Sequence, residues 1–282
     1  MSTITPPRLP AVDVTAPTPD DLQLWSVTTI IGVLDKPALI YWASAEAADC
    51  AIHNERTWKA MLHDDGEEAA IKYIRDARFR RPKDQRSAAE LGTAVHAACE
   101  EYALTGTRPQ VDDEVRPFLD QFDEWLYKWQ PTYEAAEMTV YHPDYGYAGT
   151  GDAIVTIDGM RLFLDYKSTR KSFDTRGEQT KPYPEVGLQL AAYRYAKFAA
   201  AWNARRFEKF RRRYYLLSPE EVSTGVPVPE VDDGMVIHIT PEHVTMHPVR
   251  CDEQTFESFL HVLEAARWKF EMADRTVGPA LG

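Results

Sequence analysis

Two short apolar runs in the middle of the chain lie on either side of a polar turn sequence, and this pattern predicts a β-hairpin. Residues 152–157 and 160–167 are rich in β-forming side chains, and they flank Asp158-Gly159. This dipeptide is favoured in two-residue type I′ turns. We therefore expect two antiparallel strands joined by a tight turn.

The expected turn also predicts the register of the hairpin. If Ile157 pairs with Met160, the numbers of paired residues add up to 317, so Asp152 lies opposite Asp165. Lys167 follows two residues later and projects from the same face. Opposed carboxylates destabilise a sheet unless a positive charge lies between them, and a divalent cation would supply it. The alternative is a solvated hairpin end with a weak Asp165–Lys167 ion pair.

Two helices are predicted before the hairpin. Residues 87–90 (Ser-Ala-Ala-Glu) form a capping box, so a helix should begin there and continue to about Leu104. It contains His96, with Glu100 one turn later on the same face. Residues 112–130 carry apolar side chains at three- and four-residue intervals, which predicts an amphipathic helix with a core-facing stripe.

The remaining pattern predicts further strands and helices around a polar loop at 168–184. Gln189 and Tyr193 are four residues apart in one of these helices and share a face. Together the predicted elements indicate a mixed α/β fold. The expected strands are 134–142, 211–217, 236–239 and 244–248, and the expected helices are 184–202 and 252–274.

The order of these polar residues resembles a known signature. Asp152 follows a glycine-rich turn, Asp165-Tyr166-Lys167 ends the hairpin, and Gln189-Leu-Ala-Ala-Tyr193 lies on the next helix. Gly92-Thr-Ala-Val-His96 precedes them with G-x-x-x-H spacing. Over about residues 90–195 the chain resembles the PD-(D/E)XK nucleases, specifically the RecB-like exonuclease branch that includes CRISPR-associated and phage enzymes.

The resemblance implies a metal-dependent site. Its metal ligands would be His96, Asp152, Asp165 and the carbonyl oxygen of Tyr166, and its catalytic residues Asp152, Asp165, Lys167, Gln189 and Tyr193. Oxygen ligands suit Mg²⁺ or Mn²⁺, and the imidazole makes Mn²⁺ more acceptable. Glu100 and Glu137 are weaker candidates that would orient the ligands. Taken singly, a helical histidine or a glutamate at a strand margin is more often structural or solvated.

The same resemblance implies a restriction-endonuclease-like core with a central mixed sheet flanked by helices. Residues 1–22, with five prolines, are expected to form an extended arm. Residues 23–275 are expected to form one nuclease domain, followed by a tail at 276–282. Its predicted parts are a helical part at 23–130, a catalytic core at 85–217 and a C-terminal addition at 235–275.

Composition limits the cofactors and the mode of DNA binding. The three cysteines, Cys50, Cys99 and Cys251, are too few for the four-cysteine iron–sulfur cluster of some relatives, so none is expected. The net charge of −12 argues against a generally basic nucleic-acid surface. Local contacts to DNA are expected from cations that lie among aromatic residues or in the polar loop, and the alternative, which any single residue fits slightly better, is a solvated helix end or edge strand. They are Arg78, Arg80, Arg81, Lys171, Arg211, Arg212 and Arg213.

These observations predict a metal-dependent DNA exonuclease for recombination or DNA processing. The alternatives are a structure-dependent endonuclease or nickase, a catalytically silent DNA-binding module, and a structural or assembly protein. Relatives work beside single-strand annealing proteins, often in phages, and some form ring-shaped homo-oligomers. An annealing protein and further copies of this chain are therefore expected partners, by analogy only. Apolar runs are too short to span a bilayer, and no export signal begins the chain, so we expect a cytoplasmic protein, in the host if phage-encoded.

Overall fold

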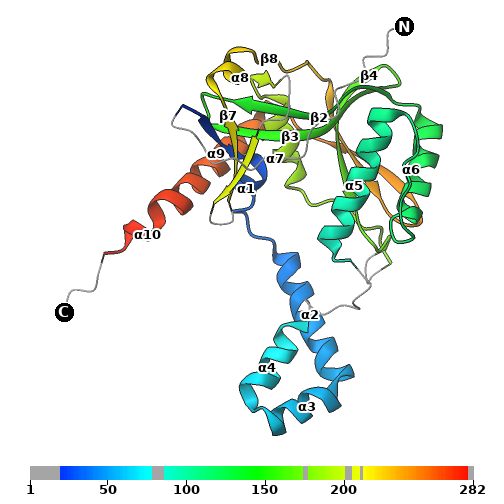
Figure 1. Ribbon diagram of the computed structural model, residues 1–282, viewed down its shortest axis with the longest axis vertical. Helices are drawn as coiled ribbons and strands as arrows, with labels where there is room; N and C mark the ends of the chain where they lie inside the picture. Colours follow the sequence, from blue (N-terminus) through cyan, green and yellow to red (C-terminus); the bar gives the residue numbers. More distant parts are fainter. Residues whose placement is uncertain (1–19, 78–85, 174–176, 201–204, 210–211, 279–282) are drawn as a thin grey trace. The chain divides into compact units, whose positions relative to one another are not determined.

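Strand β3 (Tyr147–Ile157) is central to the sheet of the computed structural model (Figure 1). It pairs antiparallel with β2 (Thr132–His142) and β4 (Met160–Ser168), and parallel with β1 (Leu22–Ser26). The main strand order is β10-β9-β4-β3-β1-β7-β6. Beside this path, β2 pairs with β3 and with β5, and β5 also pairs with β8. The other strands are β5 (Phe198–Ala199), β6 (Arg205–Lys209), β7 (Arg212–Leu217), β8 (Val226–Pro227), β9 (Asp233–Ile239) and β10 (Val244–Val249).

Helices cover both faces of this mixed sheet, which confirms the predicted mixed α/β fold (Figure 1). α5 (Ala88–Thr105) and α6 (Arg116–Trp129) pack on one face, and α1 (Val27–Ile31), α7 (Val186–Arg194) and α9 (Glu253–Arg267) on the other. The remaining helices are α2 (Pro37–His53), α3 (Glu55–Asp64), α4 (Glu67–Arg75), α8 (Pro219–Ser223), the π-helix η2 (Trp268–Met272) and α10 (Ala273–Thr276).

The structure describes residues 20–77, 86–173, 177–200, 205–209 and 212–278. Contacts between Cα atoms divide the chain into two compact units, Leu34–Glu90 and the remainder. One domain over 23–275 stays a prediction, because compactness does not decide whether the units fold separately. Within the described residues, no helix is both long and apolar enough to cross a membrane.

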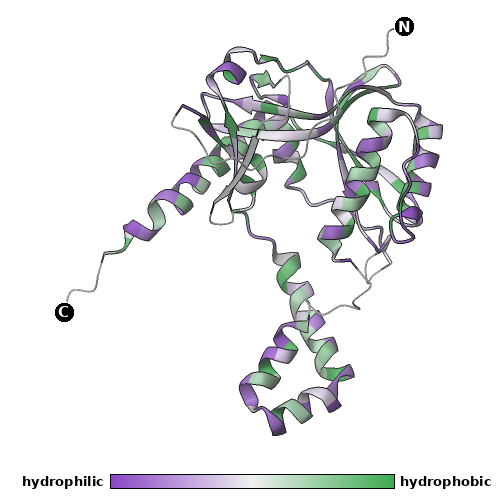
Figure 2. Cartoon of the chain, viewed as in Figure 1, coloured by the Kyte–Doolittle hydropathy of each residue, from purple (hydrophilic) through white to green (hydrophobic). Residues whose placement is uncertain are grey.

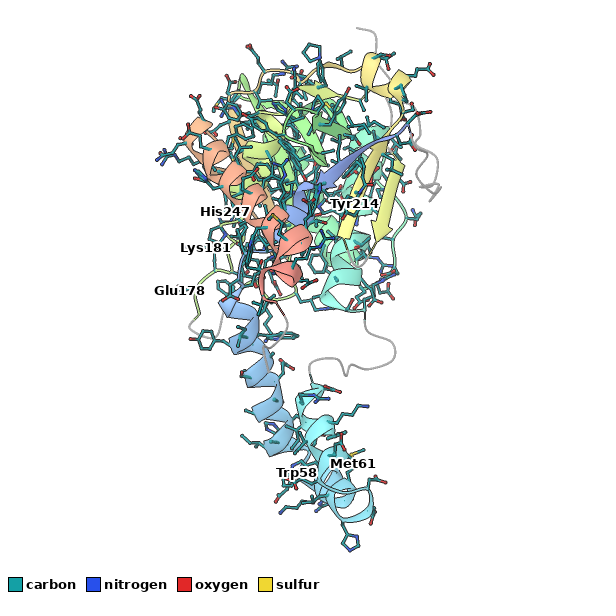
Figure 3. All side chains as sticks on the ribbon, turned by 90° about the vertical axis from the view of Figure 1, so that its left-hand side faces the viewer. Trp58, Met61, Glu178, Lys181, Tyr214 and His247 are labelled. Atoms are coloured by element: carbon teal, nitrogen blue, oxygen red, sulfur yellow. The ribbon has the colours of Figure 1, made fainter. Side chains whose placement is uncertain are left out.

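The unit Leu34–Glu90 consists of α2, α3, α4 and the first turn of α5, and it buries little apolar surface. Trp58, labelled on α3 in Figure 3, donates a hydrogen bond from Nε1 to the Ala51 carbonyl at 3.0 Å. Hydrophobic residues run along α2 (Figure 2), and Tyr41 is 76% exposed there. Side-chain packing therefore contributes less to this unit than to the sheet unit.

The structure confirms the predicted hairpin register. Pairs from Ile157↔Met160 to Ala153↔Leu164 all have residue numbers that add up to 317. Both turn residues of Asp158-Gly159 have positive φ, at 50° and 81°, as a type I′ turn requires.

The predicted capping box at the start of α5 is also confirmed. The Ser87 backbone N–H donates to Glu90 Oε2 at 2.6 Å, and the Glu90 N–H donates to Ser87 Oγ at 2.9 Å. These bonds satisfy two of the backbone donors that a helix start leaves without partners. The helix that carries His96 therefore begins where the sequence predicts.

Three predicted helix details are wrong. The helix expected to continue to Trp202 ends at Arg194, because the chain turns there and the Lys197 N–H donates to the Tyr141 carbonyl beside β2. The helix expected from 112 begins at Arg116, since Asp112 Oδ1 instead accepts backbone N–H groups of a turn. Trp268, whose place among the apolar residues of the helix expected at 252–274 predicted a core position, is 53% exposed, because five residues after buried Leu263 an α-helix has turned by about 140° from it.

A buried histidine makes the sheet sensitive to pH. Nε2 of His238 on β9 lies 3.1 Å from Thr169 Oγ1, and its ring centroid lies 6.0 Å from that of His247 on β10. Burial, followed by His247 and His243, lowers the pKa of His238 to about 4. Burial and the neighbouring Lys181 also lower the pKa of His247. Lys181 and His247 are both labelled in Figure 3.

We expect His238 to reduce stability in mild acid. An unfolded-state pKa of about 6.5 lies above the folded one, so the unfolded state binds an extra proton and stability falls as the pH decreases from about 6.5 to 4. His238→Gln should flatten the pH dependence of urea unfolding over this range. His63→Gln, at an exposed position, is the control. Equal slopes in His238→Gln and the wild type would contradict the prediction.

Close packing at Gly151 on β3 leads to a second stability prediction. A Cβ atom there would lie 2.0 Å from Cε1 of Phe163, whose ring is fully buried. Gly151→Ala should lower the free energy of unfolding by about 1–3 kcal/mol. Gly92→Ala is the control, because its Cβ would be 3.7 Å from Ser168 Oγ, and alanine favours helix. Urea unfolding measures both, and the prediction fails if Gly151→Ala is as stable as the wild type.

Candidate metal centre

The backbone N–H and carbonyl of Tyr166 organise the candidate centre. Its N–H donates a 2.6 Å hydrogen bond to Asp152 Oδ2, just beyond the last paired residues of β3 and β4. Its carbonyl oxygen lies 2.8 Å from Nε2 of His96, which extends from α5. The same Nε2 lies 3.2 Å from Asp152 Oδ2. An imidazole, a carboxylate and a carbonyl oxygen therefore meet where the two strands separate.

Glu137 joins this group from β2. Ligating atoms of His96, Glu137 and Asp152 all lie within 4.8 Å of one another. On β2 the flanking pairs are Ala136↔Ala153 and Met138↔Gly151, so Glu137 faces Asp152 across the strands. Its φ of +49° is rare for a residue with a side chain, and such backbone strain is found preferentially at functional sites.

A second set of polar residues surrounds Asp165. This carboxylate is 1% exposed, and its Oδ2 lies 2.5 Å from the Lys167 ammonium. Its Oδ1 accepts a 2.8 Å hydrogen bond from Gln189 Nε2 on α7. Gln189 Nε2 also lies 3.2 Å from the Tyr193 hydroxyl. Asp165, Lys167, Gln189 and Tyr193 thus form one connected network.

The charges of the two sets influence each other. Burial lowers the pKa of His96, but the Asp152 carboxylate and the Tyr166 carbonyl outweigh this and raise it to about 9. Burial is also the main reason that the pKa of Asp165 is raised; Lys167 opposes this effect and the Asp152 charge adds to it. For Lys167, the attraction of both aspartates exceeds the effect of burial and raises the pKa. The lysine is therefore a cation at neutral pH.

The residues present fit a divalent cation. Asp152, Glu137 and the Tyr166 carbonyl offer oxygen atoms, and His96 offers one nitrogen, a donor set that suits Mg²⁺ and Mn²⁺. Buried Asp165 Oδ2 accepts no hydrogen bond from the residues that the structure describes and has Lys167 as its ionic partner. Nearby carboxylates favour the binding of a cation.

The other candidates from the sequence lie outside this group. Asp165 contacts Lys167 and Gln189 and is not among the residues that converge with His96. Glu100 lies one turn further along α5 and is not part of the converging group either. Lys171 is exposed in the loop after β4. Arg78, Arg80, Arg81 and Arg211 lie outside the described residues, and only the backbone of Arg212 and Arg213 is described.

The sequence contains a second turn that predicts where Glu137 lies. Pro143-Asp-Tyr-Gly146 is a turn sequence, and it closes a hairpin in which His142 pairs with Tyr147. Counting outward from this turn brings Glu137 opposite Asp152. The Tyr133 hydroxyl, 2.9 Å from the Tyr166 hydroxyl, had no comparable signal, because this contact depends on tertiary packing.

Comparisons with known proteins leave the family of this chain open. No protein-family model matches it, and no curated protein matches it. Among solved structures, one titled "Crystal structure of SSO0001" aligns with 12% sequence identity and a TM-score of 0.34, covering 88% of this chain and 76% of that one. A similarity at this level carries no argument about fold or function.

Metal titration would test the grouping of the ligands. We expect Asp152→Asn and Glu137→Gln each to weaken Mn²⁺ binding about tenfold or more, since even residues outside the coordination sphere contribute about 10–100-fold. The measurement is isothermal titration calorimetry. Asp113→Asn, which changes a carboxylate that is 91% exposed, should leave the affinity unchanged. Wild-type affinity in both Asp152→Asn and Glu137→Gln would refute the grouping.

Proposed function

We propose that this protein is a metal-dependent deoxyribonuclease that hydrolyses phosphodiester bonds, and an exonuclease of the PD-(D/E)XK type. The observation that carries the proposal is the pair of adjoining polar sets where β3 and β4 separate, beyond the pair Ala153↔Leu164. One set can hold a cation through His96, Glu137, Asp152 and the Tyr166 carbonyl. The other presents the Lys167 ammonium next to it.

The residues of the second set each have a chemical role beside the metal in this proposal. Mg²⁺ or Mn²⁺, when bound, supplies Lewis-acid polarisation of the scissile phosphate. Lys167 holds the attacking water and offsets the negative charge that develops on the phosphate oxygens. Asp165 keeps the lysine charged and in position, and Gln189 holds Asp165 through the 2.8 Å hydrogen bond. Tyr193 supports Gln189 from the next turn of α7.

The resemblance to RecB-like exonucleases supports an end-dependent reaction in recombination or DNA processing. The proposed partner is a single-strand annealing protein or another recombination protein. The proposed location is the cytoplasm, and a homo-oligomer is one proposed form of the enzyme. A structure-dependent endonuclease or nickase uses the same chemistry, and a silent DNA-binding module would keep the fold without turnover. The substrate experiment below separates these three functions.

Digestion of matched linear and closed circular DNA with Mg²⁺ or Mn²⁺ tests the proposal. We expect degradation of the linear form alone. Lys167→Ala should lower the rate about 10²–10³-fold or more, because it removes a charge that acts on the transition state, while Mn²⁺ still binds. Lys197→Ala, a lysine paired with Asp144 outside the site, is the matched control.

Other outcomes have distinct meanings. Cleavage of the closed circular form would replace the exonuclease with an endonuclease or nickase. DNA retention with no cleavage of either form, in the presence of bound metal, would favour the silent binding module. Full activity in Lys167→Ala would refute the catalytic role of this lysine.

A further inference from the structure

The polar loop at 168–184 leads from β4 towards α7, and its described residues are fixed to the rest of the fold. Arg170 Nη2 lies 2.5 Å from Glu114 Oε1, just before α6. The Thr180 hydroxyl donates a 2.9 Å hydrogen bond to the Lys171 carbonyl, which joins the two halves of the loop. The loop therefore holds its side chains in defined places beside the strand that carries the catalytic lysine.

Ser172 determines which side chains of the loop face outward. It is 4% exposed, and its hydroxyl lies 2.9 Å from Thr240 Oγ1 and donates to the Glu242 carboxylate. Side chains alternate along an extended segment, so Lys171 and Phe173 on either side of it point away from the sheet. Both are exposed, Phe173 by 50%.

The returning half of the loop repeats this arrangement. Lys181 and Tyr183 are separated by one residue, as Lys171 and Phe173 are, and both are exposed, Tyr183 by 50%. Lys181, labelled in Figure 3, lies near His247 on β10, where its charge adds to burial in lowering the pKa of that histidine. The loop thus presents two pairs of a lysine and an aromatic residue.

The loop is basic in an acidic protein. Over residues 168–184, four basic and two acidic side chains give a net charge of +2, against −12 for the whole chain. Among the residues that the structure describes, neither Lys171 nor Lys181 forms an ion pair with a carboxylate. Both ammonium groups can therefore pair with the phosphates of a nucleic acid.

The exposed phenylalanine favours unpaired DNA over a duplex. Phe173 has no hydrogen-bonding group, and the centroid of its ring lies 5.9 Å from that of His243, a contact that leaves half of the side chain exposed. An aromatic ring of this kind binds the face of a nucleobase by stacking. Inside a duplex the neighbouring base pairs cover that face, so only an unpaired or terminal base can bind there.

The loop is also close enough to the candidate centre for one strand to contact both. Lys171 follows Lys167 by four residues, a span of at most about 14 Å in an extended chain. Phosphates along one strand are spaced by about 3.4 Å or more, so a strand bound at Lys167 reaches the loop within about four nucleotides.

We propose that this loop binds the unpaired strand of a DNA substrate. A base stacks on Phe173, Lys171 and Lys181 hold the phosphates, and Tyr183 supplies a second ring. The inference rests on the proposed deoxyribonuclease function and specifies its substrate, which is DNA with an unpaired strand leading to the scissile bond.

Fluorescence anisotropy with the full-length protein in EDTA tests the proposal, because DNA then binds without being cleaved. The probes are a labelled oligothymidylate of about 20 nucleotides and the blunt duplex of the same length. We expect the oligothymidylate to bind more tightly by about fivefold or more, the value of stacking one base. Equal or tighter binding of the duplex would overturn the proposal, as would binding of neither probe.

Variants of Phe173 separate stacking from apolar packing. Phe173→Leu removes the aromatic face and keeps an apolar side chain, so it should weaken oligothymidylate binding about fivefold and leave duplex binding unchanged. Phe173→Tyr keeps the ring and should bind like the wild type. Tyr127→Ala, which removes an 84% exposed ring from the last turn of α6, is the control. Unchanged affinity in Phe173→Leu, with a wild-type circular dichroism spectrum, would overturn the role of the loop.

A lysine variant tests the phosphate contact. Lys171→Ala should weaken binding of the oligothymidylate and reduce the slope of log affinity against log salt concentration by about 0.7. An unchanged slope would overturn this contact.

These measurements need no catalysis, so they are distinct from the digestion experiment. Linear DNA digestion with unchanged binding in Phe173→Leu would remove the loop from the substrate site and leave the nuclease proposal in place. Selective oligothymidylate binding that depends on Phe173, in a protein that cleaves nothing, would support the loop and refute the nuclease.

Discussion

The hydrogen bond from the Tyr166 backbone N–H to the Asp152 carboxylate is the contact on which the centre depends. Along most of the hairpin, strand β4 donates its N–H groups to backbone carbonyls of β3. At Asp152 a side-chain oxygen takes this role, so the strands separate without leaving a buried donor unpaired. The carbonyl on the other side of Tyr166 then faces His96. The backbone of one residue, Tyr166, thus orients two side chains that are far apart in the sequence.

A second constraint is the cost of burying Asp165. Its carboxylate is almost inaccessible to solvent, and an isolated charge there would be strongly destabilising. Lys167 and Gln189 offset this cost from two different elements, and the small residue Gly149 lets the Tyr193 ring lie against β3. The position of α7 is therefore coupled to the charge of the Asp165 carboxylate on β4.

The two faces of the sheet have different roles around the same strand. Asp165 and the residues of α7 lie on one face, while the Tyr166 side chain is buried on the other among α5 and α6. Because side chains alternate along a strand, neighbouring residues serve the polar network and the core in turn. On this second face the Tyr133 hydroxyl lies 2.9 Å from the Tyr166 hydroxyl.

The sequence by itself determined the local features. The Asp158-Gly159 turn and the capping box before α5 depend on neighbouring residues, so they could be predicted, together with the register and the mixed α/β class. Family resemblance supplied the candidate residues of the site.

Only the tertiary structure decided how those residues combine. Glu137 joins His96 and Asp152, whereas Asp165 pairs with Lys167, and α7 ends early because the chain turns back toward β2. These outcomes depend on strand separation and on competition between buried hydrogen-bond partners distant in the sequence. No local pattern encodes that competition, because its energies arise only when the elements pack.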